Sequence, residues 1–184
     1  TQDEGWFRMA FDTAGVRYSY ISVQDIRDTP NLKDRFDVIV LSPTGGSAQS
    51  IVNGISKEGE PIPWKPLEGF PNLGGPAETD NIRGGMELQG VLNLEKFLSE
   101  GGLLITVGGT GRVPIDYGLI SGVSIEQPQN LVAPGGVFKT TNAASSSPVL
   151  KGYGQSLPVY YSTRSLLLAA GGGFGGGGRP GAGQ

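Results

Sequence analysis

Seven residues are the candidates for ligand binding in this sequence, and they form two groups: three carboxylates and one glycine turn. They are Asp3, Glu4, Asp116, Gly108, Gly109, Thr110 and Gly111. The turn follows an apolar run, so its backbone amides suit an anion bound at the end of a strand. Its spacing matches neither the dinucleotide-binding nor the Walker glycine motif, which favours a tight structural turn. Carboxylates near element ends suit acid–base chemistry or a cation site, but helix capping is their commoner role.

The sequence contains no cysteine and no histidine. Thiolate nucleophiles, Cys-type zinc sites and Ser-His-Asp or Cys-His catalysis are therefore excluded within this chain. Carboxylate chemistry, lysine chemistry and an oxygen-ligand cation site remain open. Hydrolases and amidotransferases of the α/β class place a nucleophile elbow at such a turn. Because Thr110 is the only hydroxyl of this turn and no histidine is present to activate it, we expect no working nucleophile there.

Two apolar runs predict the strands that position the turn. They lie within residues 36–43 and 101–107, and apolar residues at helical spacing over residues 86–99 separate them. A continuous apolar run predicts a strand buried on both faces. Two such strands joined through a helix predict a parallel sheet, which binds its ligands at the carboxyl ends of the strands. The fold class is therefore predicted to be α/β.

The remainder of the N-terminal part is predicted as two helices, a strand, one helical turn and a long connection. The helices cover residues 3–14 and, behind a Ser47 N-cap, residues 48–53. The strand covers residues 16–23, and the helical turn covers residues 24–28, before Pro30. Residues 54–85 form a proline- and glycine-rich connection, with Trp64 and Phe70 as its expected anchors. A connection of this length is often functional.

The C-terminal part is predicted to be richer in strands. Helical starts are expected at residues 113–119 and 147–150, and strands at residues 122–127, 137–141, 157–161 and 165–169. Nine of the last fourteen residues are glycine. We therefore predict one domain over residues 1–170 and a flexible glycine-rich tail or loop over residues 171–184.

Composition narrows the classes of partner. The net charge is −3 without a basic stripe, so no nucleic-acid partner is expected. An apolar run of about 18 residues is lacking, so no membrane span is expected. The first residues carry no signal-peptide pattern, but a mature secreted chain would also lack one. Because parallel α/β domains usually begin with a strand, the initial helix suggests that a strand lies upstream of Thr1 in a longer protein.

The order of several short motifs resembles a known accessory domain. These motifs are Thr1-Gln2-Asp3-Glu4-Gly5-Trp6, Gly15-Val16-Arg17-Tyr18, Phe36-Asp37-Val38-Ile39, Gly84-Gly85-Met86, Gly101-Gly102 and Pro114-Ile115-Asp116-Tyr117-Gly118. The domain is the glutamine-amidotransferase-like domain that follows the catalytic domain in large bacterial zinc carboxypeptidases of the carboxypeptidase A type. The resemblance covers about residues 1–170.

The resemblance implies a three-layer, flavodoxin-like parallel sheet of the class I amidotransferase type, cut at both ends. It carries over no catalytic residue, because the amidotransferase triad needs the missing cysteine and histidine. Zinc would belong only to a separate peptidase domain, and no cofactor is expected in this chain. The resemblance also implies a periplasmic or extracellular location.

Three functions follow as hypotheses. The first is a non-catalytic accessory or binding domain, whose partner is another domain of the same polypeptide or another chain. The second is a structural subunit, possible as a homo-oligomer, that pairs through exposed sheet edges. The third is a carboxylate-based hydrolase built from Asp3, Glu4 and Asp116 around the Gly108–Gly111 turn. Convergence of those carboxylates in one cleft would favour the third.

Overall fold

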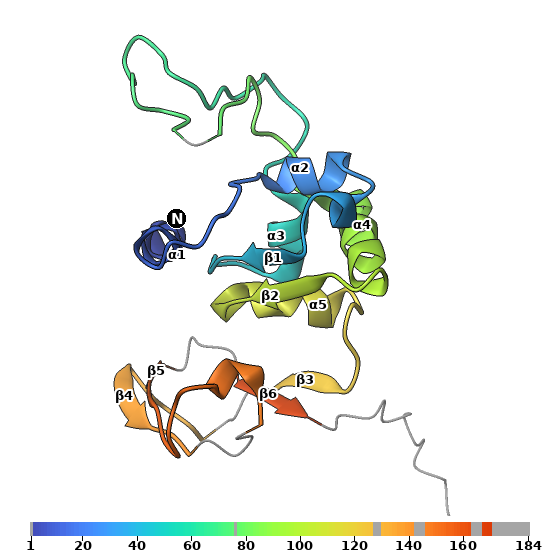
Figure 1. The fold of residues 1–184 in the computed structure, drawn as a ribbon. Helices are drawn as coiled ribbons and strands as arrows, with labels where there is room; N and C mark the ends of the chain where they lie inside the picture. The colour runs from blue at the N-terminus through green and yellow to red at the C-terminus, as the bar shows by residue number, and fades with distance from the viewer. Residues whose placement is uncertain (1, 76, 127–129, 142–145, 163–166, 171–184) are drawn as a thin grey trace, which may run out of the picture. The chain divides into compact units, whose positions relative to one another are not determined.

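The computed structural model describes residues 2–75, 77–126, 130–141, 146–162 and 167–170 (Figure 1). These residues combine helices with short strands, as the predicted α/β class requires. The chain divides into two compact units, Thr1–Val123 and Ser124–Gln184, which we describe separately. The predicted tail, residues 171–184, lies outside the described residues, so the domain boundary at residue 170 stays a prediction.

The first unit is built around one pair of parallel strands. Strand β1 (Val38–Leu41) pairs with β2 (Leu103–Thr106), and Val38 lies opposite Leu103 in the register. The accompanying helical elements are α1 (Gln2–Thr13), α2 (Val23–Asp28), η1 (Leu32–Asp34), α3 (Ala48–Asn53), α4 (Glu87–Ser99), η2 (Gly108–Gly111) and α5 (Arg112–Asp116). The predicted parallel pairing and the predicted helices at 48–53 and 86–99 are confirmed.

One face of the β1–β2 sheet carries the hydrophobic core. Ile39 on β1 belongs to a buried apolar cluster that includes Phe97 and Leu94 of α4, and Leu104 of β2 packs against it. Phe97 is fully buried, and a Cβ on Gly102 would lie 2.4 Å from its ring. Glycine at position 102 therefore lets the start of β2 approach the aromatic ring closely.

The opposite face of the same sheet is exposed. The exposed fractions of Val38, Leu103 and Ile105 are 46%, 53% and 40%. We call these three side chains the open face. The prediction that this strand is buried on both faces is therefore wrong in the described structure, because the helices packed on the core cluster cover only one side of the pair.

Short polar signals set the ends of the early helices. The Ser22 hydroxyl accepts from the Asp25 amide at 3.0 Å, and the Asp25 carboxylate accepts from the Ser22 amide at 2.7 Å. This capping box starts α2 at Val23 and leaves residues 16–22 without regular structure. The strand predicted over residues 16–23 is therefore wrong.

Helix α1 forms close to where the sequence predicts it. Gly15, at φ +66°, follows its end, as a left-handed cap requires. None of its described residues is buried, and Trp6 and Met9 are more than half exposed. Its apolar side chains therefore add nothing to the core of this unit as described.

The second unit consists of short strands. Strand β3 (Val123–Glu126) pairs with β6 (Leu167–Ala170), while β4 (Gly136–Lys139) pairs antiparallel with β5 (Pro158–Tyr161). A 3-10 turn, η3, covers Pro148–Leu150. These elements match the predicted strands to within a few residues, although each sheet has only two strands.

Candidate functional site

The Gly108–Gly111 turn lies at the carboxyl end of β2, next to the turn that follows β1. A Cβ on Gly109 would lie 2.3 Å from the backbone oxygen of Thr44, and one on Gly108 would lie 3.6 Å from Cβ of Pro43. Gly109 therefore permits direct backbone contact between the two turns. The four residues form the 3-10 helix η2, which leads directly into α5.

Thr110 joins the two strand ends and is almost fully buried, at 2% exposure. Its Oγ1 accepts from the Val107 amide at 3.0 Å and lies 2.9 Å from the carbonyl oxygens of both Leu41 and Val107. The hydroxyl therefore accepts one proton and shares its own between two carbonyl oxygens. The turn is closed by this buried side chain, which links it to the end of β1.

The three candidate carboxylates lie on two helices. Asp3 and Glu4 are in the first turn of α1, where they suit the positive end of the helix dipole. Glu4 forms an ion pair with Arg8, with Oε1 and Nε 2.6 Å apart. Asp116 is the exposed last residue of α5. These positions fit the capping and surface roles of the three side chains.

The long connection, residues 54–85, is a braced arm rather than a structureless loop. Figure 1 shows it leaving the rest of the first unit as a closed excursion between α3 and α4. Its two legs are joined by reciprocal backbone hydrogen bonds between Trp64 and Thr79, at 2.8 and 3.0 Å. Arg83 adds hydrogen bonds from Nε to the Glu60 carbonyl at 2.6 Å and from Nη1 to the Ser56 carbonyl at 3.0 Å. We call this segment the arm.

The far part of the arm exposes large apolar side chains. The exposed fractions of Trp64, Leu67 and Phe70 are 45%, 38% and 67%. Trp64 does fix the connection, as predicted, but through its backbone pair with Thr79 rather than through a buried ring. The side chain of Phe70 is mostly exposed and does not anchor the connection. We call Trp64, Leu67 and Phe70 the arm tip.

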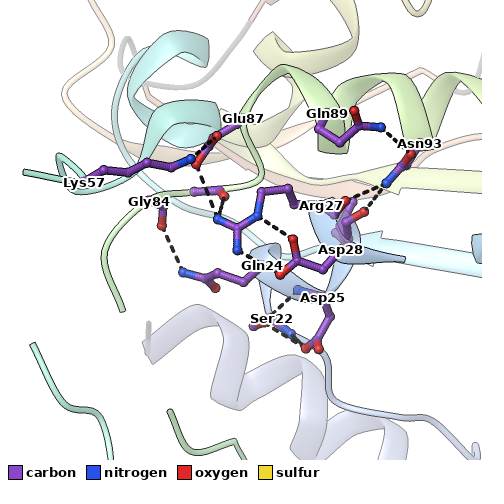
Figure 2. Close-up of polar contacts among 12 residues, drawn as sticks. Ser22, Gln24, Asp25, Arg27, Asp28, Lys57, Gly84, Glu87, Gln89 and Asn93 are labelled. Carbon is purple, nitrogen blue, oxygen red and sulfur yellow. Dashed lines mark hydrogen bonds and ion pairs between the residues drawn. The ribbon is translucent and has the colours of Figure 1, made fainter. Parts of the chain in front are cut away.

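A charged cluster fastens the base of the arm to α2 and α4 (Figure 2). Glu87, the first residue of α4, accepts from Lys57 Nζ at 2.7 Å and from Arg27 Nη1 at 3.3 Å. Arg27 also forms a bidentate pair with Asp28, at 2.7 and 2.8 Å. Glu87 has a positive φ of 56°, which is unusual for a residue other than glycine. The cluster therefore holds a locally strained junction between the arm and α4.

Two amide side chains complete this junction. Gln24 Nε2 donates to the Gly84 carbonyl at 2.9 Å, which ties α2 to the end of the arm. Asn93 is buried at 4% exposure, and its Nδ2 donates to the carbonyls of Ile26 and Arg27 at 2.9 and 2.8 Å. Asn93 Oδ1 accepts from Gln89 at 3.0 Å. The carbonyls at the end of the short helix α2 are thereby satisfied by a side chain from α4.

The electrostatics of the cluster are those of a structural ion-pair network. The hydrogen bond from Lys57, with the added charge of Arg27, lowers the pKa of Glu87. The hydrogen bond from Arg27 likewise lowers the pKa of Asp28. Both shifts favour the charged forms of the carboxylates, so neither group is tuned as a proton donor near neutral pH.

Sequence reasoning missed this cluster because its members are distant along the chain. Arg27 and Glu87 are sixty positions apart, and no local spacing connects them. Only the Ser22–Asp25 capping box had a local signature, a serine followed three positions later by an acid.

Among the residues that the structure describes, no group of three or more acidic side chains is arranged to hold a metal ion. No helix in the described part is long and apolar enough to cross a membrane. Comparison with known proteins adds no relative, since no family profile matches the chain and no curated protein or solved structure matches it significantly.

Proposed function

We propose that this chain is a non-catalytic accessory domain that binds another protein surface through the open face of β1–β2. The proposal is supported by the contrast between the turn at the carboxyl end of this sheet and its exposed face. Its carboxyl-end turn is closed by the buried Thr110, whereas Val38, Leu103 and Ile105 remain exposed in one patch. The register places Val38 opposite Leu103 and Ile105 two residues further along the same strand, so the three side chains are neighbours on one face. Large contiguous apolar patches on a protein surface mark interaction sites.

The proposal extends to the fold. A parallel sheet is normally covered by helices on both faces. In the three-layer, flavodoxin-like domain that the sequence resembles, a second layer would lie over the open face. The resemblance supports a class I amidotransferase-like domain attached to a periplasmic or extracellular zinc carboxypeptidase. Peptide hydrolysis and zinc would then belong to the other domain, and this chain would contribute binding.

Hydrogen–deuterium exchange tests the proposal. The exchange of backbone amides in residues 38–41 and 103–106 is measured in this chain alone, at a dilution at which copies do not associate, and in the natural-length protein. We expect slower exchange of both strands in the natural-length protein, because a partner surface then covers them. The amides of α4 serve as the matched control and should exchange equally in both. Equal exchange of the two strands in both proteins would overturn the proposal.

A second candidate, assembly through strand pairing, is favoured by the outer edges of the same sheet. Among the described residues, β1 and β2 pair only with each other. A free strand edge is a template for a strand from another chain. The same exchange measurement separates the two candidates, because edge pairing would protect alternate amides of one strand, whereas face packing would protect both strands.

A further inference from the structure

We propose that the arm tip of one copy of this chain packs on the open face of a second copy. This inference rests on the proposed function, since it names the partner of the same surface. The arm tip is Trp64, Leu67 and Phe70, and the open face is Val38, Leu103 and Ile105. Both surfaces are present in every copy, so two copies can exchange arms and satisfy both contacts in a closed pair.

The arm is built to present its tip with little loss of conformational freedom. The Trp64–Thr79 backbone pair and the Arg83 contacts fix its legs. An ion pair between Lys65 and Asp80, at 2.5 Å, lies next to that backbone pair. At the base, a Cβ on Gly54 would lie 2.8 Å from the Gly85 amide nitrogen, so the legs meet in backbone contact. A pre-ordered segment incurs a smaller entropy cost on binding than a flexible one.

The side chains of the tip suit an apolar partner surface. Aromatic residues are the commonest anchors of protein interfaces. Trp64 and Phe70 are 45% and 67% exposed although the arm around them is ordered by hydrogen bonds. The open face offers β-branched and leucine side chains on two adjacent strands.

The area available matches a weak but specific association. The exposed parts of Trp64 and Phe70 amount to roughly 200 Å², given the 150–250 Å² of an aromatic side chain. The four partly exposed aliphatic side chains, Leu67, Val38, Leu103 and Ile105, add roughly 250 Å², or about 60 Å² each. Two reciprocal contacts then bury about 900 Å², which is the size of a weak, transient interface.

The natural absence of cysteine provides a clean test. Phe70→Cys is placed in one preparation of the chain and Leu103→Cys in another, and the two are mixed in equal amounts and oxidised. We expect the disulfide that joins one Phe70→Cys chain to one Leu103→Cys chain to form severalfold more often than random collision between the two preparations would give. Each substitution replaces an exposed side chain, so circular dichroism should match that of the unmodified chain. Leu67→Cys with Ile105→Cys gives a second pair in case one variant fails to fold.

The matched control replaces Leu103→Cys by Glu95→Cys, an exposed position on α4, and should give only the random proportion. Random or homotypic disulfides from both tip–face pairs would overturn the inference. A third outcome is slower amide exchange of both strands in the natural-length protein together with only random disulfides from the tip–face pairs. In that case another surface covers the open face, so the inference fails and the proposed function stands. If the strands are not protected there, the proposed function itself fails.

Discussion

The two faces of the β1–β2 sheet carry the same apolar residue types, but one face is buried and the other is exposed to solvent. On one face, Ile39 is 4% exposed and contributes to the core with Phe97. On the other, Leu103 is 53% exposed although it belongs to the same strand as the partly buried Leu104. The difference lies in what is packed above each face, since the α4 side chains cover only the first.

This comparison separates residues that hold the fold from residues that are free to bind. Burial of an apolar side chain stabilises the folded state only where the chain itself supplies the cover. The inner face therefore carries stability, and the open face carries little. Substitutions on the two faces should therefore differ in their effect on the free energy of unfolding.

The largest effect is expected for Phe97→Ala on the core side. Loss of a fully buried phenylalanine should lower the free energy of unfolding by about 3–5 kcal/mol, because it removes apolar contacts and leaves a cavity. Urea denaturation followed by circular dichroism measures the change. Leu103→Ala is the matched control and should cost less than about 1 kcal/mol. Equal losses from the two substitutions would contradict the one-sided core.

Asn93→Ala is expected to have the next largest effect, at about 2 kcal/mol. The substitution leaves the carbonyls of Ile26 and Arg27 without their buried donor. The neighbouring Gln89→Ala removes only one contact from an exposed side chain and should cost far less. The same denaturation measurement compares them. If the two losses are similar, Asn93 does not hold α2 to α4.

Ser22→Ala should cost about 1 kcal/mol, the usual value of a helix N-cap. The capping box starts α2, which positions Arg27 beside the base of the arm. Ser19→Ala lies in the same irregular segment outside the capping box and provides the control. Thermal unfolding of the three proteins measures the difference, and an unchanged midpoint for Ser22→Ala would exclude a role for the cap.

The smallest effect is expected from acid titration of the arm junction. The pKa of Glu87 is lowered in the folded state from 4.5, so its contribution to stability is present above that value. It is lost as the pH falls through the lower folded pKa. The stability of Glu87→Gln should therefore change less than that of the unmodified chain below about pH 4.5. Parallel pH profiles of the unfolding midpoint would argue against this linkage.

The sequence predicted the positions of the strands better than their environments. The apolar runs and flanking glycines located β1 and β2, and the helical spacing between them located α4. The exposure of Leu103 and Ile105 was not predictable from the sequence, because the same apolar residue types occur on a strand face that is covered by helices and on one that faces water. Burial depends on which elements lie above a face, and local pattern does not encode that.

The local features of the candidate site were predictable from the sequence, whereas its long-range contacts were not. The glycine turn was correctly placed after a strand, and Thr110 was correctly identified as its only hydroxyl. The arm was predicted from proline and glycine content, but its bracing was not. The backbone pair between Trp64 and Thr79, and the Arg27–Glu87 contact, join residues far apart along the chain. Such contacts follow from the folded arrangement and leave no local spacing.

Thiol labelling can show whether the sheet is covered on one face and open on the other. Single cysteines are placed by Leu103→Cys and Ile39→Cys in the otherwise cysteine-free chain, and their rates of modification are measured at high dilution. We expect the cysteine at position 103 to react at least tenfold faster than the one at position 39, which should react only through opening of the fold. Equal rates at both positions in the folded chain would contradict the account.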